Sequence, residues 1–523
     1  MSEALSGLGT KIVVRTSQID PIGNIENAPL RRSRINARLG YVLNRNWARV
    51  ALAAPSTDTH LFAKEQNMSQ RIIGIDLAVT AKHKAMIFDP ALSEFVGRQV
   101  TFRARPNDLD RLLRLARKDA PADVTLVAVL EATGMAWYPV SIYLERQGVA
   151  TYRINGQKTR DLRRAIWKHT SSDRIDSRVL AHLYQMAPDR LIRCPLPCGD
   201  LLTLQRACRT YDRWRKEDVA VQNRIKAIDN WAWDGLHRVI PATAQKWMRQ
   251  NWYNPWHVCA AGVDHLTLAW QTFSGKPDTD LSWIDRWLAQ AQMLTQLYGD
   301  ERFVGYDQLQ EAMIDLLQQH DTYKQQQKNL LVETIEPLYQ HLYPDCQLTT
   351  IPGIGIQSAA TYRAFIQDIN RFDTVERFRR WCGIVPRSKQ SGDSQAKGLS
   401  LTKAGPNLIK GTLFLNAEVA RQWDVQMAAI YRRQMVEYGK HHLQAACACA
   451  SHLANRIYAV LKQQRPYQLR DLAGMPISAK RSRELCLELK VPDEVRQRNS
   501  KWARRRRAEQ QTEARTRRRE HAS

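Results

Sequence analysis

The spacing of apolar residues changes along the chain and separates regions of different secondary structure. Between residues 69 and 190, short apolar runs predict strands over 71–76, 83–89, 96–103, 124–131 and 149–154. Segments of helical period predict helices over 107–118, 136–147, 157–168 and 172–186. Three early strands followed by alternating helices and strands indicate an α/β domain, with a mixed sheet and helices on its faces.

From residue 199 the apolar spacing is mostly helical. The stretches 201–228 and 306–342 are long, charged and amphipathic, and they predict an antiparallel coiled coil or a dimerising arm within a helical region over 199–345. Tryptophans between them are interpreted as the core of a small helical unit, in preference to a platform for stacking bases. They are Trp231, Trp233, Trp247, Trp252, Trp256, Trp270, Trp283 and Trp287. Residues 346–465 are predicted to form a second helical domain.

The two ends of the chain have a different composition. Residues 1–67 carry many arginines and little periodicity, which indicates either a disordered extension or an upstream start codon with Met68 as the working start. Residues 466–523 are assigned to a basic tail. Its last segment, 501–523, has nine basic and three acidic side chains and is predicted to be disordered and to bind phosphate backbone without sequence preference.

Charge and composition narrow the classes of partner. A formal net charge of +26 and a pI of about 9.9 favour a polyanion, of which nucleic acid is the commonest. No apolar stretch is long enough to span a bilayer and no secretion signal is visible, so no membrane partner and a cytoplasmic location are expected. Nine cysteines without a pairing framework fit free thiols in a reducing compartment.

Four acidic residues occupy positions that a metal-dependent nuclease site would need. Asp76 and Glu131 each end an apolar run, and a buried strand that ends in an acid is costly unless the acid has a partner. Asp173 and Asp176 are three residues apart on a predicted helix and therefore share one face. Convergence of four carboxylates suits a hard divalent cation and phosphodiester chemistry. The alternative is a set of ordinary solvated carboxylates.

Three other segments carry groups that suit phosphate. The helix predicted over 157–168 is basic, the turn over 351–355 presents backbone N–H groups at a helix start, and the loop over 383–405 places a serine among cations. The turn is similar to the hairpin of helix-hairpin-helix DNA-binding modules. A solvated helix face, a plain turn and an ordinary loop serine are the alternatives. The residues concerned are Arg160, Arg163, Arg164, Lys168, Gly353, Gly355, Arg387, Lys389, Ser391 and Lys403.

Taken together, these motifs resemble the transposases of the insertion-sequence 110/1111 family, which are related to the Piv-type DNA invertases. The segment 73–76 looks like the first acid motif of the family, 131–134 like its second, and 172–181 is similar to the motif T-D-x-x-D-A with serine at two positions. Residues 351–355 match the opening of the C-terminal transposase domain. Residues 383–387, 390–392 and 402–405 match the segment that holds the catalytic serine, which carries over to Ser391.

The resemblance implies a RuvC-like (RNase H-type) domain over 68–190, whose Asp76, Glu131, Asp173 and Asp176 form a DEDD site for Mg²⁺. It also implies a coiled-coil arm and a C-terminal domain over 346–465 that supplies the serine nucleophile. In that family a noncoding bridge RNA pairs with target and donor DNA. The assembly is a homo-oligomer, a dimer or a tetramer, in which acids of one subunit meet the serine of another.

The function expected from these features is that of a DNA transposase or site-specific recombinase that forms a covalent phosphoserine intermediate. A site-specific DNA invertase is an alternative of the same type. In a metal-dependent, structure-specific nuclease of the Holliday-junction type, water would cleave the DNA and Ser391 would only bind phosphate. A nucleic-acid-binding scaffold is the alternative without catalysis.

Overall fold

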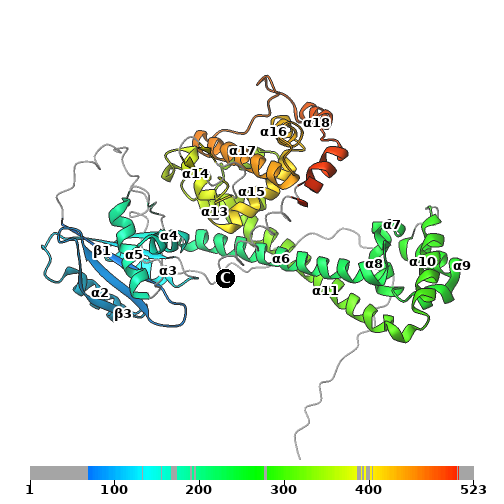
Figure 1. Cartoon of the computed structure of the whole chain (residues 1–523), viewed down its shortest axis with the longest axis horizontal. Coiled ribbons are helices and arrows are strands. Elements are labelled where there is room, and N and C mark those ends of the chain that lie inside the picture. Colours follow the sequence, from blue (N-terminus) through cyan, green and yellow to red (C-terminus); the bar gives the residue numbers. More distant parts are fainter. Residues whose placement is uncertain are drawn as a thin grey trace, which may run out of the picture. The chain divides into compact units, whose positions relative to one another are not determined.

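A computed structural model of the chain (Figure 1) forms two units, residues 1–67 and residues 68–523. The structure describes residues 69–131, 134–154, 156–166, 173–188, 191, 193, 196–275, 280–385, 390–391, 394–395, 401–402, 405–502 and 504–505. The predictions for residues 1–67 and for Met68 lie outside the described residues. All the described helices and strands belong to the second unit.

A mixed five-stranded sheet forms the first part of this unit. Its strands are β1 (Gln70–Asp76), β2 (His83–Asp89), β3 (Glu94–Phe102), β4 (Thr125–Glu131) and β5 (Ala150–Ile154), in the order β3-β2-β1-β4-β5. Strands β1, β4 and β5 are parallel, whereas β2 and β3 are antiparallel to their neighbours. The five predicted strands are confirmed, with bounds that differ by no more than two residues.

Helices cover both faces of the sheet, as the alternation of the strand residues requires. On one face, α2 (Pro106–Arg117) and α3 (Trp137–Arg146) bury side chains against Ile73 and Ile75 of β1. On the other, α5 (Asp173–Met186) packs against Ile72, and α4 (Gly156–Ile166) lies beside α5. The predicted α/β domain is confirmed, and its sheet is consistent with an RNase H-like fold.

Two long helices that follow the sheet domain in the sequence run antiparallel to each other. Helix α6 (Gly199–Ala232) packs along α11 (Tyr306–Leu330), which continues through a π-helical turn into α12 (Glu336–Leu342). The Tyr306 hydroxyl donates to the Ala232 carbonyl at one end of the pair, while Tyr339 shares a core with Leu204 at the other. The predicted pair of helices is confirmed, whereas its coiled-coil geometry and its role in dimerisation stay predictions.

The insert between these helices has an aromatic core. It comprises α7 (Leu236–Val239), α8 (Ala242–Asn251), α9 (Pro255–Ser274) and α10 (Ser282–Tyr298). Trp233 and Trp287 are fully buried in it, and five more of the eight tryptophans pack in or against the same cluster, while Trp231 is half exposed. The interpretation of these tryptophans as a helical core is confirmed, because their ring faces are used for packing.

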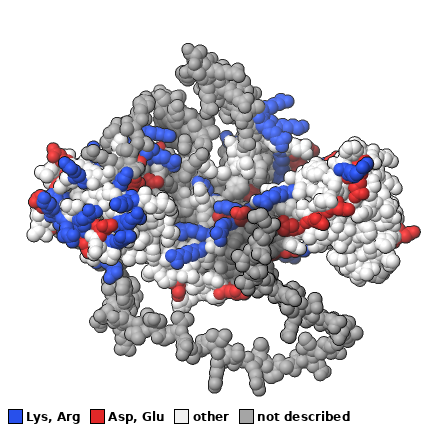
Figure 2. All heavy atoms as spheres, turned by 90° about the horizontal axis from the view of Figure 1, so that it is seen from below, with Lys and Arg blue, Asp and Glu red and all other residues white. Residues whose placement is uncertain are grey.

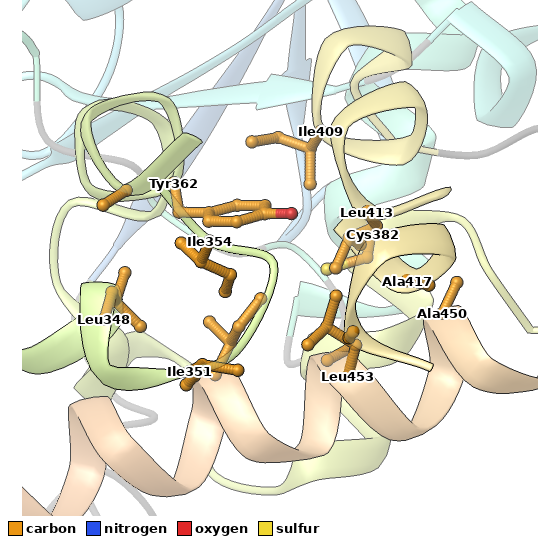
Figure 3. Packing of buried hydrophobic residues seen from close by; sticks show 14 of the residues in the cluster. Leu348, Ile351, Ile354, Tyr362, Cys382, Ile409, Leu413, Ala417, Ala450 and Leu453 are labelled. Carbon is orange, nitrogen blue, oxygen red and sulfur yellow. The ribbon is translucent and has the colours of Figure 1, made fainter. Parts of the chain in front are cut away.

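The last helical region surrounds a core that also takes in the start of α6 (Figure 3). Its elements are α13 (Ile356–Ile366), α14 (Val375–Cys382), the short strands β6 (Gln390–Ser391) and β7 (Ser394–Gln395), α15 (Asn407–Ala420), α16 (Val425–Val436) and α17 (His442–Gln463). Ile351 and Ile354, from the turn before α13, point into this core together with Leu413 of α15 (Figure 3).

Residues 466–502 correct one prediction, because they belong to the folded part although the sequence assigned them to a basic tail. The buried carboxylate of Asp424 accepts hydrogen bonds from Arg456 and from the Tyr467 hydroxyl. Helix α18 (Ala479–Glu488) packs on α16, and the buried Asn499 amide donates to the Met435 carbonyl. These contacts join distant residues, so the local charge pattern did not indicate them. Residues 506–523 lie outside the described residues.

Candidate metal and nucleophile sites

Asp76 and Glu131 end neighbouring parallel strands. Ile75 of β1 lies opposite Leu130 of β4, so the two acids that come next stand at the same edge of the sheet. Side chains alternate along a strand, which places Asp76 on the face of Ile72 and Glu131 on the face of Val127. Both of these apolar residues pack toward α5, and the two acids therefore lie on the face that α5 covers.

Close packing brings the start of α5 to this edge. A Cβ at Gly74 would lie 2.0 Å from the Ser177 carbonyl oxygen and 2.8 Å from the Ala181 nitrogen, so the absence of a side chain lets α5 lie directly on β1. The Ser177 hydroxyl donates to the carbonyl of Lys84, the residue opposite Asp76. The first turn of α5, which carries Asp173 and Asp176, is thus at the edge where β1 ends.

Glu131 lies against the start of α4. A Cβ at Gly156 would stand 2.2 Å from Oε1 of Glu131 and 2.9 Å from its Cδ. Gly156 therefore leaves room for this carboxylate, which any larger residue would displace.

Asp176 forms an ion pair with Arg163 of α4. Nη1 of Arg163 lies 2.9 Å from each carboxylate oxygen of Asp176, and each side chain is about a fifth exposed, 23% for Arg163 and 22% for Asp176. Arg163, which the sequence predicted to bind nucleic acid, thus contacts one of the predicted metal ligands, and its role toward nucleic acid stays a prediction. Arg160 and Arg164 are exposed, and Nε of Arg160 donates to the Gly156 carbonyl. Lys168 and the side chain of Asp173 lie outside the described residues.

The donor set fits a hard divalent cation in its chemistry, because all the predicted ligands are carboxylates. Of the acids that the structure describes, Asp76, Glu131 and Asp176 do not form a group whose carboxylate oxygens all lie within 4.8 Å of one another. Like charges repel, and Asp176 is already paired with Arg163.

A group of three potential ligands, where the insert meets the start of α11, was missed by the sequence analysis. Among the described residues, atoms of His257, Glu301 and Asp307 lie within 4.8 Å of one another. The amide Nδ2 of the buried Asn254 donates to both carboxylates of this group, which accounts for their proximity. No spacing in the sequence could indicate it, because each ligand comes from a separate element.

The loop that carries Ser391 is fixed where it leaves the helical core. Gly383 ends α14 with a φ of +74°, and the Thr402 N–H donates to the Val385 carbonyl at 2.9 Å. Gly405 has a φ of +85°, and a Cβ there would lie 2.0 Å from the Trp381 carbonyl oxygen. The two ends of the loop are therefore held side by side.

Within this loop, Ser391 of β6 pairs with Ser394 of β7 through the backbone. The side chain of Ser391, together with Arg387, Lys389 and Lys403, lies outside the described residues. Their roles stay predictions.

The two glycines of the turn before α13 have different surroundings. Gly353 has a φ of +87°, and a Cβ there would lie 2.6 Å from the Asn416 carbonyl oxygen. The Asn416 amide donates to the Gly353 carbonyl at 2.6 Å, so Gly353 is needed for packing against α15. Gly355 is exposed, and a Cβ there would meet no atom within 4 Å. Phosphate contact, which the sequence predicted for both, is compatible with the open surface at Gly355.

Basic side chains are unevenly distributed. Figure 2 shows Lys and Arg gathered on the part that holds α2 and β3, whereas the insert carries few charges. Residues 231–305 contain six Lys and Arg and seven Asp and Glu, in a chain of net charge +26. No helix in the described ranges is both long and apolar enough to cross a membrane.

Comparison with known proteins gives matches over both functional regions. A DEDD transposase model of the IS110 type matches residues 73–228, and the model described as the transposase IS116/IS110/IS902 family matches residues 346–432. The first region contains the four predicted metal ligands and the second contains Ser391.

Three curated relatives each match about a quarter of the chain. It is 30% identical over 132 residues to the insertion element IS110 uncharacterized 43.6 kDa protein of Streptomyces coelicolor, covering 25% of this chain and 32% of that protein. It is 29% identical over 123 residues to the pilin gene-inverting protein of Moraxella lacunata (24% and 38%). It is 28% identical over 130 residues to the transposase for insertion sequence element IS1111A of Coxiella burnetii (24% and 35%). The chain spans about a third of the length of these relatives. The chain is thus similar to IS110-type transposases over both regions, which follow one another in the order that the motifs predicted.

Proposed function

We propose that this protein is a DNA transposase or site-specific recombinase that cuts DNA through a covalent phosphoserine intermediate. The observation that carries the proposal is the meeting of Asp76, Glu131 and the first turn of α5 at one edge of the sheet, in a chain whose other matched region contains Ser391. An edge lined with acids suits a divalent ion. The resemblance to the family indicates that Ser391 is the nucleophile.

Asp76, Glu131, Asp173 and Asp176 would hold Mg²⁺. When bound, such an ion supplies stabilisation of charge on the phosphate oxygens and lowers the pKa of the attacking hydroxyl. The four carboxylates would hold the ion, and basic side chains of α4 and of the serine loop would contact the phosphates on either side of the cut.

The chemical step belongs to Ser391. Its Oγ forms a bond to phosphorus while the bond from phosphorus to the 3′-oxygen breaks, so the DNA 5′-phosphate becomes esterified to serine. The serine hydroxyl loses a proton and the departing 3′-oxygen gains one, which leaves a free 3′-hydroxyl. Attack of a different 3′-hydroxyl on the phosphoserine releases serine and joins new DNA ends.

The assembly and the nucleic-acid partners are inferred from the family. We infer that the antiparallel pair α6 and α11 is a coiled-coil arm that joins subunits in a dimer or tetramer, so that acids of one subunit can meet Ser391 of another. DNA is the substrate, in agreement with the net charge of +26 and with the inversion activity named for the Moraxella relative. A bridge RNA is proposed from the family resemblance alone.

Trapping of protein on DNA tests this function. The purified full-length chain would be incubated with Mg²⁺ and a plasmid that carries its coding sequence with the native flanking DNA, then denatured and examined for DNA-linked protein. Wild type should form the adduct and Ser391→Ala should form none, while the neighbouring variants Ser388→Ala and Ser394→Ala retain it. Asp76→Asn should give neither cleavage nor adduct.

Other outcomes identify the alternatives. Cleavage without an adduct would indicate the metal-dependent nuclease, and binding without cleavage would indicate the scaffold. Inversion of the DNA between two sites on the plasmid, with an adduct, would favour an invertase. RNA transcribed from the flanks should copurify with the wild-type chain; its absence would refute the guide RNA and leave the serine chemistry standing.

A further inference from the structure

Helix α4 contacts two of the four predicted metal ligands. Its first residue, Gly156, leaves room for the Glu131 carboxylate, and two turns later Arg163 pairs with Asp176. Helices α4 and α5 also pack together. A shift of α4 caused by a change at Glu131 would therefore also alter its contact with Asp176. Helix α4 therefore takes part in positioning the acids at this edge of the sheet.

The Arg163–Asp176 pair has the geometry of a chelated cation. A single nitrogen, Nη1, lies 2.9 Å from both carboxylate oxygens, instead of two nitrogens each donating to one oxygen. A metal ion bound by both oxygens of a carboxylate also lies on the line that bisects them. The guanidinium of Arg163 therefore occupies the place at Asp176 that a metal ion would take.

We propose that Arg163 is a resident cation of the acid site: it holds Asp176 while the site is free of metal and is displaced when a divalent ion binds. This inference rests on the proposed metal site. Arg163 is then a positioning residue with two partners, the Asp176 carboxylate before metal binding and a DNA phosphate afterwards. Arginine suits both partners, because its N–H groups match carboxylate and phosphate oxygens.

This competition has two consequences. Metal binding must break the ion pair, so Arg163 lowers the affinity of the site for metal. DNA that accepts the released guanidinium compensates for the broken pair, so DNA and metal should strengthen each other's binding by the same factor. A purely structural ion pair predicts the opposite sign, because its removal would loosen α4 from α5 and weaken metal binding.

Calorimetric titration of the full-length chain with Mn²⁺, without DNA, distinguishes a displaced cation from a structural ion pair. All proteins would carry His257→Ala, so that the group of His257, Glu301 and Asp307 cannot contribute. Arg163→Gln should bind Mn²⁺ about two- to fivefold more tightly than the parent, the range that one partly exposed ion pair supports. Arg163→Lys should lie near the parent, because it keeps the charge. Arg114→Gln in α2, an exposed arginine away from the acid edge, should leave the affinity unchanged.

The outcomes separate this inference from the proposed function. Unchanged or weaker Mn²⁺ binding by Arg163→Gln, in a protein whose thermal unfolding matches the parent, would overturn the inference alone. If Asp76→Asn binds Mn²⁺ like the parent, the acid edge holds no metal, and both proposals fail. With the flanking DNA duplex present, the parent should gain Mn²⁺ affinity while Arg163→Gln gains little; equal gains would also overturn the role of Arg163.

Discussion

The acid edge of the sheet and the loop that carries Ser391 are placed by different means. At the acid edge, Asp76 and Glu131 end regular strands, and α5 is pressed against β1 over Gly74. The serine loop instead extends from a helical core, and its position depends on contacts at its two ends, Val385 with Thr402 and Gly405 with Trp381.

This difference separates the tasks of the two regions. Metal ligands must keep a fixed geometry, and regular elements with buried neighbours provide it. A nucleophile that has to reach DNA bound elsewhere can lie on a loop, provided that the base of the loop is fixed. Changes at the acid edge should therefore affect metal binding and cleavage together, whereas changes at the base of the loop should reduce cleavage and the adduct and leave metal binding unchanged.

The largest effect is expected for Gly74→Ala. Its Cβ would meet the backbone of α5 at 2.0 Å, and a backbone carbonyl cannot move without moving the helix. We expect a loss of about 3 kcal/mol in the free energy of unfolding, together with loss of Mn²⁺ binding. Chemical denaturation and calorimetry would measure both. Gly411→Ala in α15 is a matched control, since a Cβ there meets no atom within 4 Å and alanine favours a helix.

Gly405→Ala should have the next largest effect and a different signature. Alanine is strained at a φ of +85°, and its Cβ would lie 2.0 Å from the Trp381 carbonyl oxygen. We expect a loss of about 2 kcal/mol in the free energy of unfolding and a strong loss of the covalent adduct. Mn²⁺ affinity should stay at the wild-type value. A parallel loss of metal binding would show that the two regions are not independent.

The regular parts of the acid edge could be predicted from the sequence. Apolar runs that end in Asp76 and Glu131 determine both the strands and the face on which the acids lie, because alternation along a strand is strict. The ion pair of Arg163 with Asp176 could not be predicted, since it depends on how α4 packs on α5. The need for glycine at 74, 156 and 405 was equally hidden, because each meets atoms of residues that are distant in the sequence.

Gly156→Ala should act on the metal site with little effect on stability. The new Cβ would lie 2.2 Å from Oε1 of Glu131, and a side-chain carboxylate can turn away at small cost. We expect about a tenfold loss in Mn²⁺ affinity, as for other changes beside metal ligands, and a change of less than about 1 kcal/mol in the free energy of unfolding. Calorimetry would measure the first and denaturation the second. Unchanged affinity would exclude Glu131 from the ligand set.

The smallest expected effect is a pH dependence of the free energy of unfolding that arises from His83, at the start of β2. Nδ1 of His83 accepts the N–H of Ala78, two residues after Asp76, and only the neutral ring can do so. Burial, with a smaller contribution from the charge of Arg103, lowers the pKa of His83 below its ordinary value of 6.5. A histidine whose pKa is lowered on folding stabilises the fold above pH 6.5 and loses that contribution as the pH falls toward the lowered value.

The free energy of unfolding should therefore fall more steeply below pH 6.5 in wild type than in His83→Asn, whose amide oxygen accepts the same N–H at every pH. Denaturation series across this range would measure the two slopes, and equal slopes would mean that the segment after Asp76 does not depend on His83.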